Sequence, residues 1–287
     1  MGLSKKSIWR IVGVGSLLLV LGLAACIPLA SRPLPKAATG PEMDEQADQL
    51  ALLMERAVNK RAWDQTAYVR WNFLGQHTHL WDRFNRQARV SWGDYTVYLN
   101  TQTGAGSAWK KGEKLEGSER QKALAKALDY FYNDSFWLNA PVKAFDEGVK
   151  REVVFQKDGS AGLLLSYQSG GVTPGDTYLW TLSPTGQPLR WNMWVQVLPI
   201  KGLGNTWEGW DTLYTGARIS KVHAAGPFKI NMIRDLASGR KLSDLGEPEN
   251  ALNPAFFEVS EAEDPGGSGG SRASEASGTE GAGASGK

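Results

Sequence analysis

Few residues in this sequence have types and spacing suited to chemistry, and two histidines come first among them. His77 and His79 are two positions apart, so in a strand both side chains lie on one face, and Asp82 follows closely. Imidazole and carboxylate groups are ligands for Zn²⁺, but ligands from one short segment rarely complete a site without a third element. His223 is isolated in the sequence. We therefore expect no metal site and no cofactor.

Catalytic motifs are absent from the central part of the chain. Residues 42–257 contain no Gly-x-Ser-x-Gly nucleophile elbow, no His-Glu-x-x-His zinc motif and no phosphate-binding loop. Turn or cap roles account for Asp134 and Asp176 without catalysis. The carboxylates that could pair as acid and base are scattered along the chain: Asp82, Asp134, Asp146, Asp176 and Asp211. We expect no catalytic residues and a protein that is not an enzyme.

The amino-terminal residues have the layout of a secretory signal. Two lysines and an arginine precede an apolar run over residues 11–25, which ends in small residues before Cys26, the only cysteine in the chain. The run of about 15 residues is shorter than the roughly 20 that a helix needs to cross a membrane. Residues 1–25 are therefore predicted to be a cleavable signal peptide.

The four residues Leu23-Ala24-Ala25-Cys26 resemble the lipobox of bacterial lipoproteins. The resemblance implies cleavage before Cys26 and lipid on its sulfur, and two or more acyl chains anchor a protein firmly to a membrane. The alternative is that Cys26 belongs to an uncleaved anchor or to a signal cut elsewhere. Ile27 is not the aspartate that retains lipoproteins at the inner membrane of enteric bacteria, so the resemblance favours the outer membrane, with the body facing the periplasm or the cell surface.

Composition divides the rest of the chain into three segments. Residues 26–41 contain four prolines and are predicted to form an extended tether. Residues 42–257 are enough for one domain with its own core. Residues 258–287 contain one apolar side chain larger than alanine and are predicted to be a disordered tail. The charges are mixed, with a net charge of +2, and nothing indicates nucleic-acid binding.

Hydrophobic periodicity predicts an α+β domain. Apolar residues three and four apart predict one helix from Met43 to Ala57 and a second over 118–133, which ends near Asn133-Asp134-Ser135. Elsewhere side chains alternate with a period of two between closely spaced turns, as in antiparallel hairpins. The predicted strands are 67–73, 88–92, 95–99, 152–156, 163–168, 177–182, 189–198 and 207–214, with Phe228, Ile230 and Met232 in a last strand. The expected fold is one large curved antiparallel sheet, a half-open β-barrel, with two helices packed on one face.

Eleven of the twelve tryptophans follow the signal segment, many of them in predicted strands. Within 189–197 the odd positions form one apolar face, whereas Trp194 lies among polar side chains. A sheet with more aromatic surface than two helices can cover predicts an apolar ligand cavity. Its candidate wall residues are Trp71, Trp92, Trp180, Trp191, Met193 and Trp194. The alternative is that the tryptophans fill a solid core.

The order of helices and strands on a lipid-anchored chain resembles the lipoprotein-localisation factor superfamily, the LolA/LolB group. The resemblance covers about residues 43–222 and includes the phrases Phe73-Leu74-Gly75, Trp81-Asp82-Arg83 and Arg89-Val90-Ser91-Trp92. It implies a half-open barrel that carries acyl chains in an apolar cavity and has no catalytic residues.

Three functions follow from these observations. The first is a non-catalytic envelope lipoprotein that binds or carries an acyl-chain or other hydrophobic ligand. The second is an interaction or structural lipoprotein with an envelope protein as its partner. The third is an enzyme acting on an envelope polymer, which requires two carboxylates facing each other across a cleft. An open apolar cavity favours the first function, and a filled core favours the second.

Overall fold

The computed structural model describes residues 31–169 and 175–252. The predicted signal peptide, Cys26 and the predicted tail lie outside these residues. The described elements, in chain order, are α2 (Pro41–Ala57), α3 (Lys60–Asp64), β1 (Tyr68–Phe73), β2 (His77–Asp82), β3 (Gln87–Trp92), β4 (Tyr95–Asn100), β5 (Gly106–Lys110), β6 (Glu113–Lys114), α4 (Gly117–Asn139), η1 (Ala140–Val142), β7 (Val149–Phe155), β8 (Ala161–Tyr167), β9 (Thr177–Leu182), β10 (Pro188–Trp194), β11 (Leu203–Thr206), β12 (Glu208–Thr212), β13 (Arg218–Ala225), β14 (Phe228–Asn231), β15 (Ile233–Gly239) and η2 (Leu242–Leu245).

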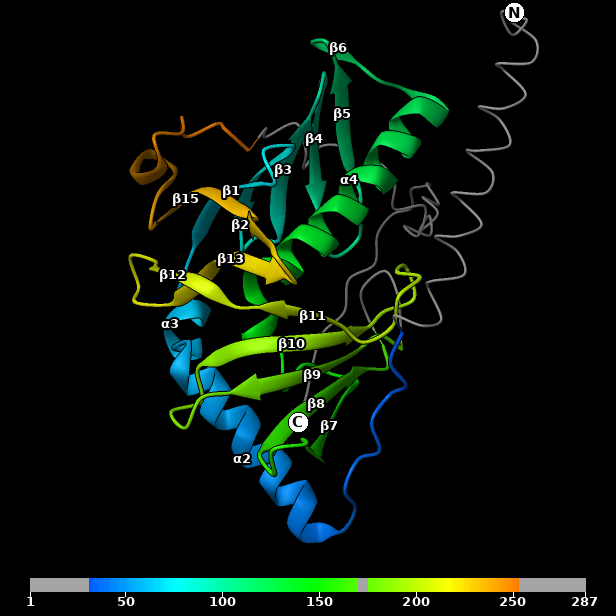
Figure 1. Cartoon of the computed structure of the whole chain (residues 1–287). Helices are drawn as coiled ribbons and strands as arrows, with labels where there is room; N and C mark the ends of the chain where they lie inside the picture. Colours follow the sequence, from blue (N-terminus) through cyan, green and yellow to red (C-terminus); the bar gives the residue numbers. More distant parts are fainter. Residues whose placement is uncertain (1–30, 170–174, 253–287) are drawn as a thin grey trace, which may run out of the picture.

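The strands form three antiparallel sheets, which confirms the predicted α+β class. The seven-stranded sheet has the order β15-β1-β2-β3-β4-β5-β6, and the five-stranded sheet has the order β11-β10-β9-β8-β7. Between them lies the three-stranded sheet β12-β13-β14 (Figure 1). Its strand β13 contacts both neighbours, through Met232 N–H to Lys221 O at 2.9 Å and His223 Nδ1 to Thr206 O at 2.8 Å. The described strands therefore make a curved, open surface that does not close into a barrel.

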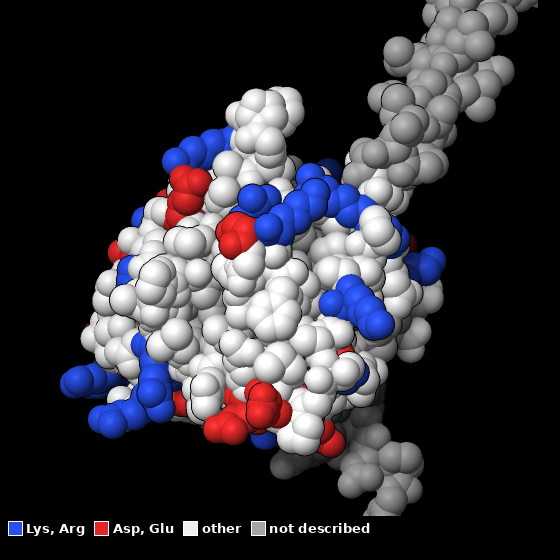
Figure 2. All heavy atoms as spheres, turned by 60° about the horizontal axis from the view of Figure 1, so that its bottom comes forward, with Lys and Arg blue, Asp and Glu red and all other residues white. Residues whose placement is uncertain are grey.

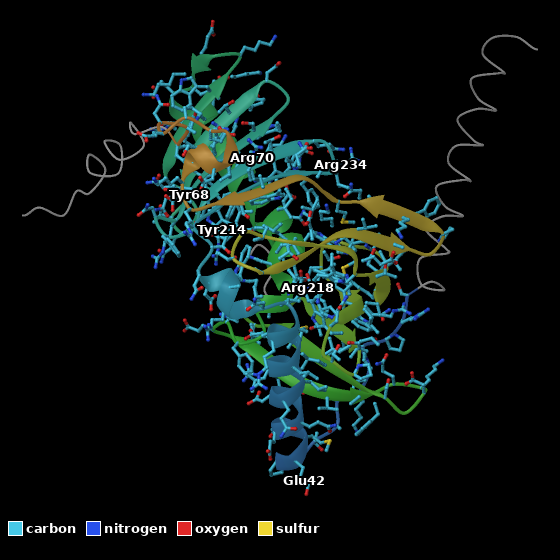
Figure 3. All side chains as sticks on the ribbon, turned by 90° about the vertical axis from the view of Figure 1, so that its left-hand side faces the viewer. Glu42, Tyr68, Arg70, Tyr214, Arg218 and Arg234 are labelled. Carbon is cyan, nitrogen blue, oxygen red and sulfur yellow. The ribbon has the colours of Figure 1, made fainter. Side chains whose placement is uncertain are left out.

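Two helices cover the apolar face of this surface. Helix α4 packs on the seven-stranded sheet through Ala123, Ala127 and Phe131, and α2 packs on the five-stranded sheet through Ala47 and its neighbours one and two turns on. The small alanine side chains let each helix lie close to its sheet. In Figure 3, Glu42 at the start of α2 lies at one end of the molecule, and Arg70 on β1 lies toward the other.

Helix α4 is longer than the sequence predicted, and the predicted end near Asn133 is wrong. The helix continues to Asn139 because Trp137 and Leu138 pack into the two core clusters, which stabilises one more turn. It ends before Pro141, which lies in the 3₁₀ helix η1 and has no backbone N–H to continue the helical hydrogen bonds. Asp134 is consequently an interior residue of the helix and not part of its terminal turn.

The alternation predicted for residues 189–197 holds only from Trp191 to Val195, because Val197, beyond the end of β10, is 70% exposed. Trp191 and Met193 are buried, but Leu189 is 45% exposed. The pairing of β10 with β9 shifts register between Pro188 and Arg190, so Leu189 occupies an irregular position. A bulge inserts one extra residue into a strand and changes the face on which the preceding side chain lies. The prediction that Leu189 belongs to the apolar face is wrong for this reason.

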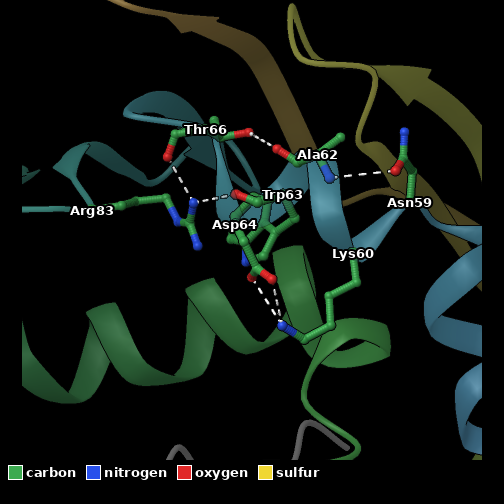
Figure 4. A network of polar contacts seen from close by, with 7 residues as sticks. All are labelled: Asn59, Lys60, Ala62, Trp63, Asp64, Thr66 and Arg83. Carbon is green, nitrogen blue, oxygen red and sulfur yellow. Dashed lines mark hydrogen bonds and ion pairs between the residues drawn. The ribbon is translucent and has the colours of Figure 1, made fainter.

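A polar network holds the short helix α3 against the seven-stranded sheet (Figure 4). Asn59 adopts a left-handed conformation with φ of 57° and accepts a hydrogen bond from Ala62 N–H at 3.3 Å. The Arg83 guanidinium donates to Trp63 O and, at 2.7 Å, to Thr66 O, and it lies 4.0 Å from the centre of the Trp63 ring. Burial lowers the pKa of Arg83 to about 10.

The segment before α2 lies along the outer face of the five-stranded sheet. Ala38 N–H donates to Val153 O at 2.8 Å, and the Trp194 indole donates to Arg32 O at 2.8 Å. Part of the predicted tether thus contacts the domain.

Among the described helices, none is long and apolar enough to cross a membrane. Figure 2 shows the face that looks downward in Figure 1. Charged side chains of both signs lie around the edge of this face, and its centre is uncharged.

Candidate functional site

A cavity of about 1070 Å³ lies where the last turns of α4 pass over the five-stranded sheet. This volume is in the range of small-molecule binding sites. Apolar and aromatic side chains make most of its wall. Those with the most ring or thioether surface are Phe136, Trp137, Tyr167, Tyr178, Trp191 and Met193. The cavity also reaches Phe73 and His77, so it extends to the end of the seven-stranded sheet.

Two of the six predicted wall residues, Trp191 and Met193, line this cavity. They are two positions apart on β10, so both side chains lie on the inner face of the five-stranded sheet. The Trp191 ring centre lies 4.7 Å from that of Tyr178 and 4.9 Å from that of Trp137. Trp191 therefore belongs to the cavity lining, but its ring is fully buried against other rings.

The other four predicted wall residues lie elsewhere. Trp180 is fully buried behind Trp191, with ring centres 4.8 Å apart, and Trp71 is fully buried in the core under α4. Trp92 is partly buried and stacks on Tyr95. Trp194 lies on the outer face, where the segment before α2 covers it. The sequence indicated which face a strand residue occupies, but not how far it lies from the cavity.

Two polar atoms on the cavity wall have no hydrogen-bond partner. They are the indole nitrogen of Trp191 and the hydroxyl of Tyr167, both buried. Burial raises the pKa of the Tyr167 hydroxyl well above its ordinary value, so this group stays protonated and able to donate. Buried polar groups normally have partners. Neither atom has appreciable accessible surface, so both belong to the packed wall and not to its open surface.

Charged groups also line the cavity. Lys143 forms an ion pair with Asp146, and Asp129 and Glu147 also line the cavity. Asp176 lines it as well, and its carboxylate accepts a hydrogen bond from Gln196 N–H at 2.9 Å. The predicted turn role of Asp176 is thus compatible with its position, and the cavity combines an apolar wall with a few polar groups.

A cluster of His77, His79 and Asp134 lies where α4 crosses β2. Asp134 Oδ2 is 2.8 Å from His77 Nδ1 and 2.7 Å from His79 Nε2. Asp134 and His79 are fully buried, whereas His77 and Asp134 both line the cavity. Asn133 Nδ2 donates to the other carboxylate oxygen, Oδ1, at 2.9 Å. Each oxygen of this buried carboxylate therefore has a polar partner.

Aromatic rings fix the two imidazoles in place. Trp71 stacks on His79 with ring centres 4.5 Å apart, and Tyr130 stacks on His77 at 3.7 Å. Burial lowers the pKa of His79, although the neighbouring Asp134 opposes this shift. The Nδ1 atom of His79 is buried without a hydrogen-bond partner. The cluster is thus packed and oriented by its neighbours.

Asp134 is the residue of this cluster that sequence reasoning missed. Asp82, suggested as the neighbour of the histidines, instead accepts hydrogen bonds from Phe84 N–H at 3.1 Å and Asn85 N–H at 3.0 Å in the hairpin turn after β2. The signal for Asp134 was its spacing, because it lies three residues after Phe131 and four before Leu138, on the apolar face of α4. A carboxylate on such a face needs polar partners in the core.

His223 is buried separately, where β13 joins the sheets. Its ring lies 5.0 Å from that of Trp137 and 4.7 Å from that of Trp207, measured between centres. Nδ1 is 2.8 Å from the Thr206 carbonyl, so Nδ1 carries the proton and Nε2 is left without a partner. Burial lowers the pKa of His223 to about 4. His223 is therefore a neutral core residue.

Comparison with known proteins gives a distant structural likeness. No family model and no curated protein matches this sequence. Among solved structures, the chain is similar to a DUF1329 family protein from Desulfovibrio piger, with 12% sequence identity and a TM-score of 0.36. The match covers 73% of this chain and 99% of that one. These comparisons assign the chain to no family.

Proposed function

We propose that this protein is a membrane-anchored cell-envelope lipoprotein that binds or carries an acyl-chain or similar hydrophobic ligand without catalysis. The cavity of about 1070 Å³ is the observation that carries the proposal. Sites for small apolar molecules are concave, mostly apolar and supplied with a few polar groups. Trp191 and Met193 belong to the apolar wall, and Lys143 and Asp146 are among the polar residues that line the cavity.

The anchor is proposed from the sequence. The lipobox at Cys26 supports lipid attachment, and the absence of the inner-membrane aspartate after it supports the outer membrane. A Cys26→Ser variant is expected to incorporate no labelled palmitate and to leave the detergent phase on phase separation. Equal labelling of the variant and the wild type would contradict the anchor while leaving the cavity proposal untouched.

Ligand binding is tested by filling the cavity. Val149 lines the cavity at the start of β7, and its replacement by tryptophan adds a ring to that space. Phe155 ends the same strand and is 56% exposed, so Phe155→Trp adds an indole outside the cavity as a matched control. We expect wild type and Phe155→Trp to bind a fluorescent fatty acid with equal affinity, and Val149→Trp to bind it at least tenfold more weakly.

Native mass spectrometry of gently purified protein gives a second readout. A ligand of lipid mass is expected on the wild type and on Phe155→Trp, and its occupancy should fall on Val149→Trp. A protein that emerges without lipid and takes up no fatty acid would refute the carrier function. Circular dichroism of both variants checks that the fold is retained.

A second function, an interaction lipoprotein with an envelope protein partner, is favoured by strand β14. Phe228 is 70% exposed and Ile230 is 37% exposed on this strand, beyond the core. Exposed apolar patches mark interaction sites more often than isolated apolar residues do. Cross-linking in cells should then recover one dominant protein from the wild type and lose it from a Phe228→Ser, Ile230→Ser variant.

A further inference from the structure

The cluster of His77, His79 and Asp134 brings together three metal-ligating side chains from two elements distant in sequence. The histidines come from β2 and the carboxylate from α4, which supplies the third element that the histidine pair lacked. One donor atom from each residue lies within 4.8 Å of the other two. We propose that these three residues bind a divalent first-row transition metal ion, against the expectation from sequence alone.

The distances from the Asp134 carboxylate to the two imidazoles are close to those that a metal requires. A tetrahedral Zn²⁺ ion bound at 2.0–2.1 Å from nitrogen and oxygen sets its ligand atoms roughly 3.3 Å apart. The carboxylate oxygen is 2.8 Å and 2.7 Å from the two imidazole nitrogens. To accommodate the ion, the Asp134 oxygen must lie about half an ångström farther from the two imidazole nitrogens. A rotation of the Asp134 carboxylate would supply this change.

The donor chemistry selects the class of metal. Two imidazole nitrogens and one carboxylate oxygen suit Zn²⁺, Fe²⁺, Co²⁺ or Ni²⁺, whereas Ca²⁺ and Mg²⁺ prefer sites made only of oxygen. The ion would also place positive charge beside Asp134, a carboxylate that the fold buries completely. Buried charges are normally paired or bound to metals.

The surroundings of the cluster have the features that orient metal ligands. Asn133 holds the second oxygen of Asp134 at 2.9 Å, and Trp71 and Tyr130 stack on the imidazole rings. Partners of this kind fix the orientation of the ligands and tune the affinity of the site. The three residues therefore need little rearrangement to bind an ion.

The site has one side open to the cavity. His77, whose side chain is 14% exposed, and the fully buried Asp134 both belong to the cavity lining, so a fourth ligand would have to come from that side. Sites with three protein ligands keep such a position for water or for a ligand. Metal binding and lipid binding are separable properties, because the ion contacts the polar cluster and does not need an occupied cavity.

The test uses the full chain purified in detergent without a polyhistidine tag and stripped of metal with a chelator. Zn²⁺ alone is the probe in calorimetry, and Co²⁺ is the probe in absorption spectroscopy, where visible bands report tetrahedral coordination. We expect one ion per chain with a dissociation constant of about a micromolar or less. His77→Gln and Asp134→Asn should each weaken binding by about a hundredfold, since each removes one of three ligands.

Asp129→Asn is the matched control. Asp129 is a carboxylate on the same helix and lines the same cavity, but it is outside the cluster. Its replacement should leave zinc affinity within twofold. If Asp134→Asn does not fold, His77→Gln decides, because the His77 side chain is 14% exposed and tolerates change better. Absence of stoichiometric zinc binding by the wild type, or equal binding by folded His77→Gln, overturns the proposal.

Discussion

The seven-stranded and five-stranded sheets share one alternating apolar pattern, yet the centre of the first packs against a filled core and the centre of the second borders a cavity. At the centre of the first, Trp71 packs against Phe131 of α4 and the stacked His79, in a core without the large cavity. At the centre of the second, Trp191 is equally buried from solvent but borders the cavity. Burial of a tryptophan therefore does not distinguish a core residue from a wall residue.

The difference arises from the helices. Helix α4 lies along the seven-stranded sheet, whereas only its last turns reach the five-stranded sheet, through Phe136 and Trp137. Helix α2 covers the part of the five-stranded sheet near β7. The cavity lies beyond the part that α2 covers, between the last turns of α4 and the inner face of the five-stranded sheet. Whether an apolar strand becomes core or wall is thus decided by the element that covers it.

Replacement of Trp71 by alanine should have the largest effect. A fully buried ring in a filled core loses its burial and leaves a void, so we expect the free energy of unfolding to fall by about 4 to 5 kcal/mol. Chemical denaturation followed by circular dichroism measures this loss. A loss below about 2 kcal/mol would mean that the core under α4 is not close-packed.

The pH dependence of stability tests the junction between the two regions, where His223 lies. Its pKa falls from 6.5 to about 4 on folding, so between these values the unfolded chain binds the proton and the folded chain does not. Stability should therefore fall as the pH drops through this window, by about 3 kcal/mol from His223. Denaturation curves at pH 7 and pH 4 for the wild type and for His223→Gln give the stability that each protein loses over this range. Equal losses in the two proteins would contradict a buried neutral histidine.

Replacement of Trp191 by alanine should cost less than that of Trp71. The ring is buried but belongs to the cavity lining, so the void left by its removal would join a space that already exists, and we expect a loss of about 2 kcal/mol. The same variant should bind a fluorescent fatty acid with altered affinity. A loss as large as that of Trp71→Ala, with no probe binding by either protein, would identify this region as solid core.

The smallest effect is expected at Leu189, on the same strand as Trp191. The register shift leaves this side chain 45% exposed, so Leu189→Ser should change the free energy of unfolding by less than about 0.5 kcal/mol. Thermal and chemical denaturation are both sensitive enough to check this. A loss above 1.5 kcal/mol would place Leu189 on the apolar face, as strict alternation predicts.

The sequence by itself determined the features that depend on local periodicity. The spacing from Met43 to Ala57 predicted α2, and the alternation in 67–73 predicted β1 with Val69, Trp71 and Phe73 on its buried face. The lipobox at Cys26 is also readable from the sequence and stays a prediction. These features follow from which side of a helix or strand each residue occupies, and this is set by neighbours a few positions away.

The tertiary structure decided the features that join distant segments. The pairing of β15 with β1 brings Ile233 beside Phe73, and the extension of α4 to Asn139 brings Asp134 to His77 and His79. The cavity depends on where the last turns of α4 lie over the five-stranded sheet. No local pattern encodes these contacts, because they result from the way whole elements pack. The cavity and the cluster of His77, His79 and Asp134 are therefore recognisable only in the folded chain.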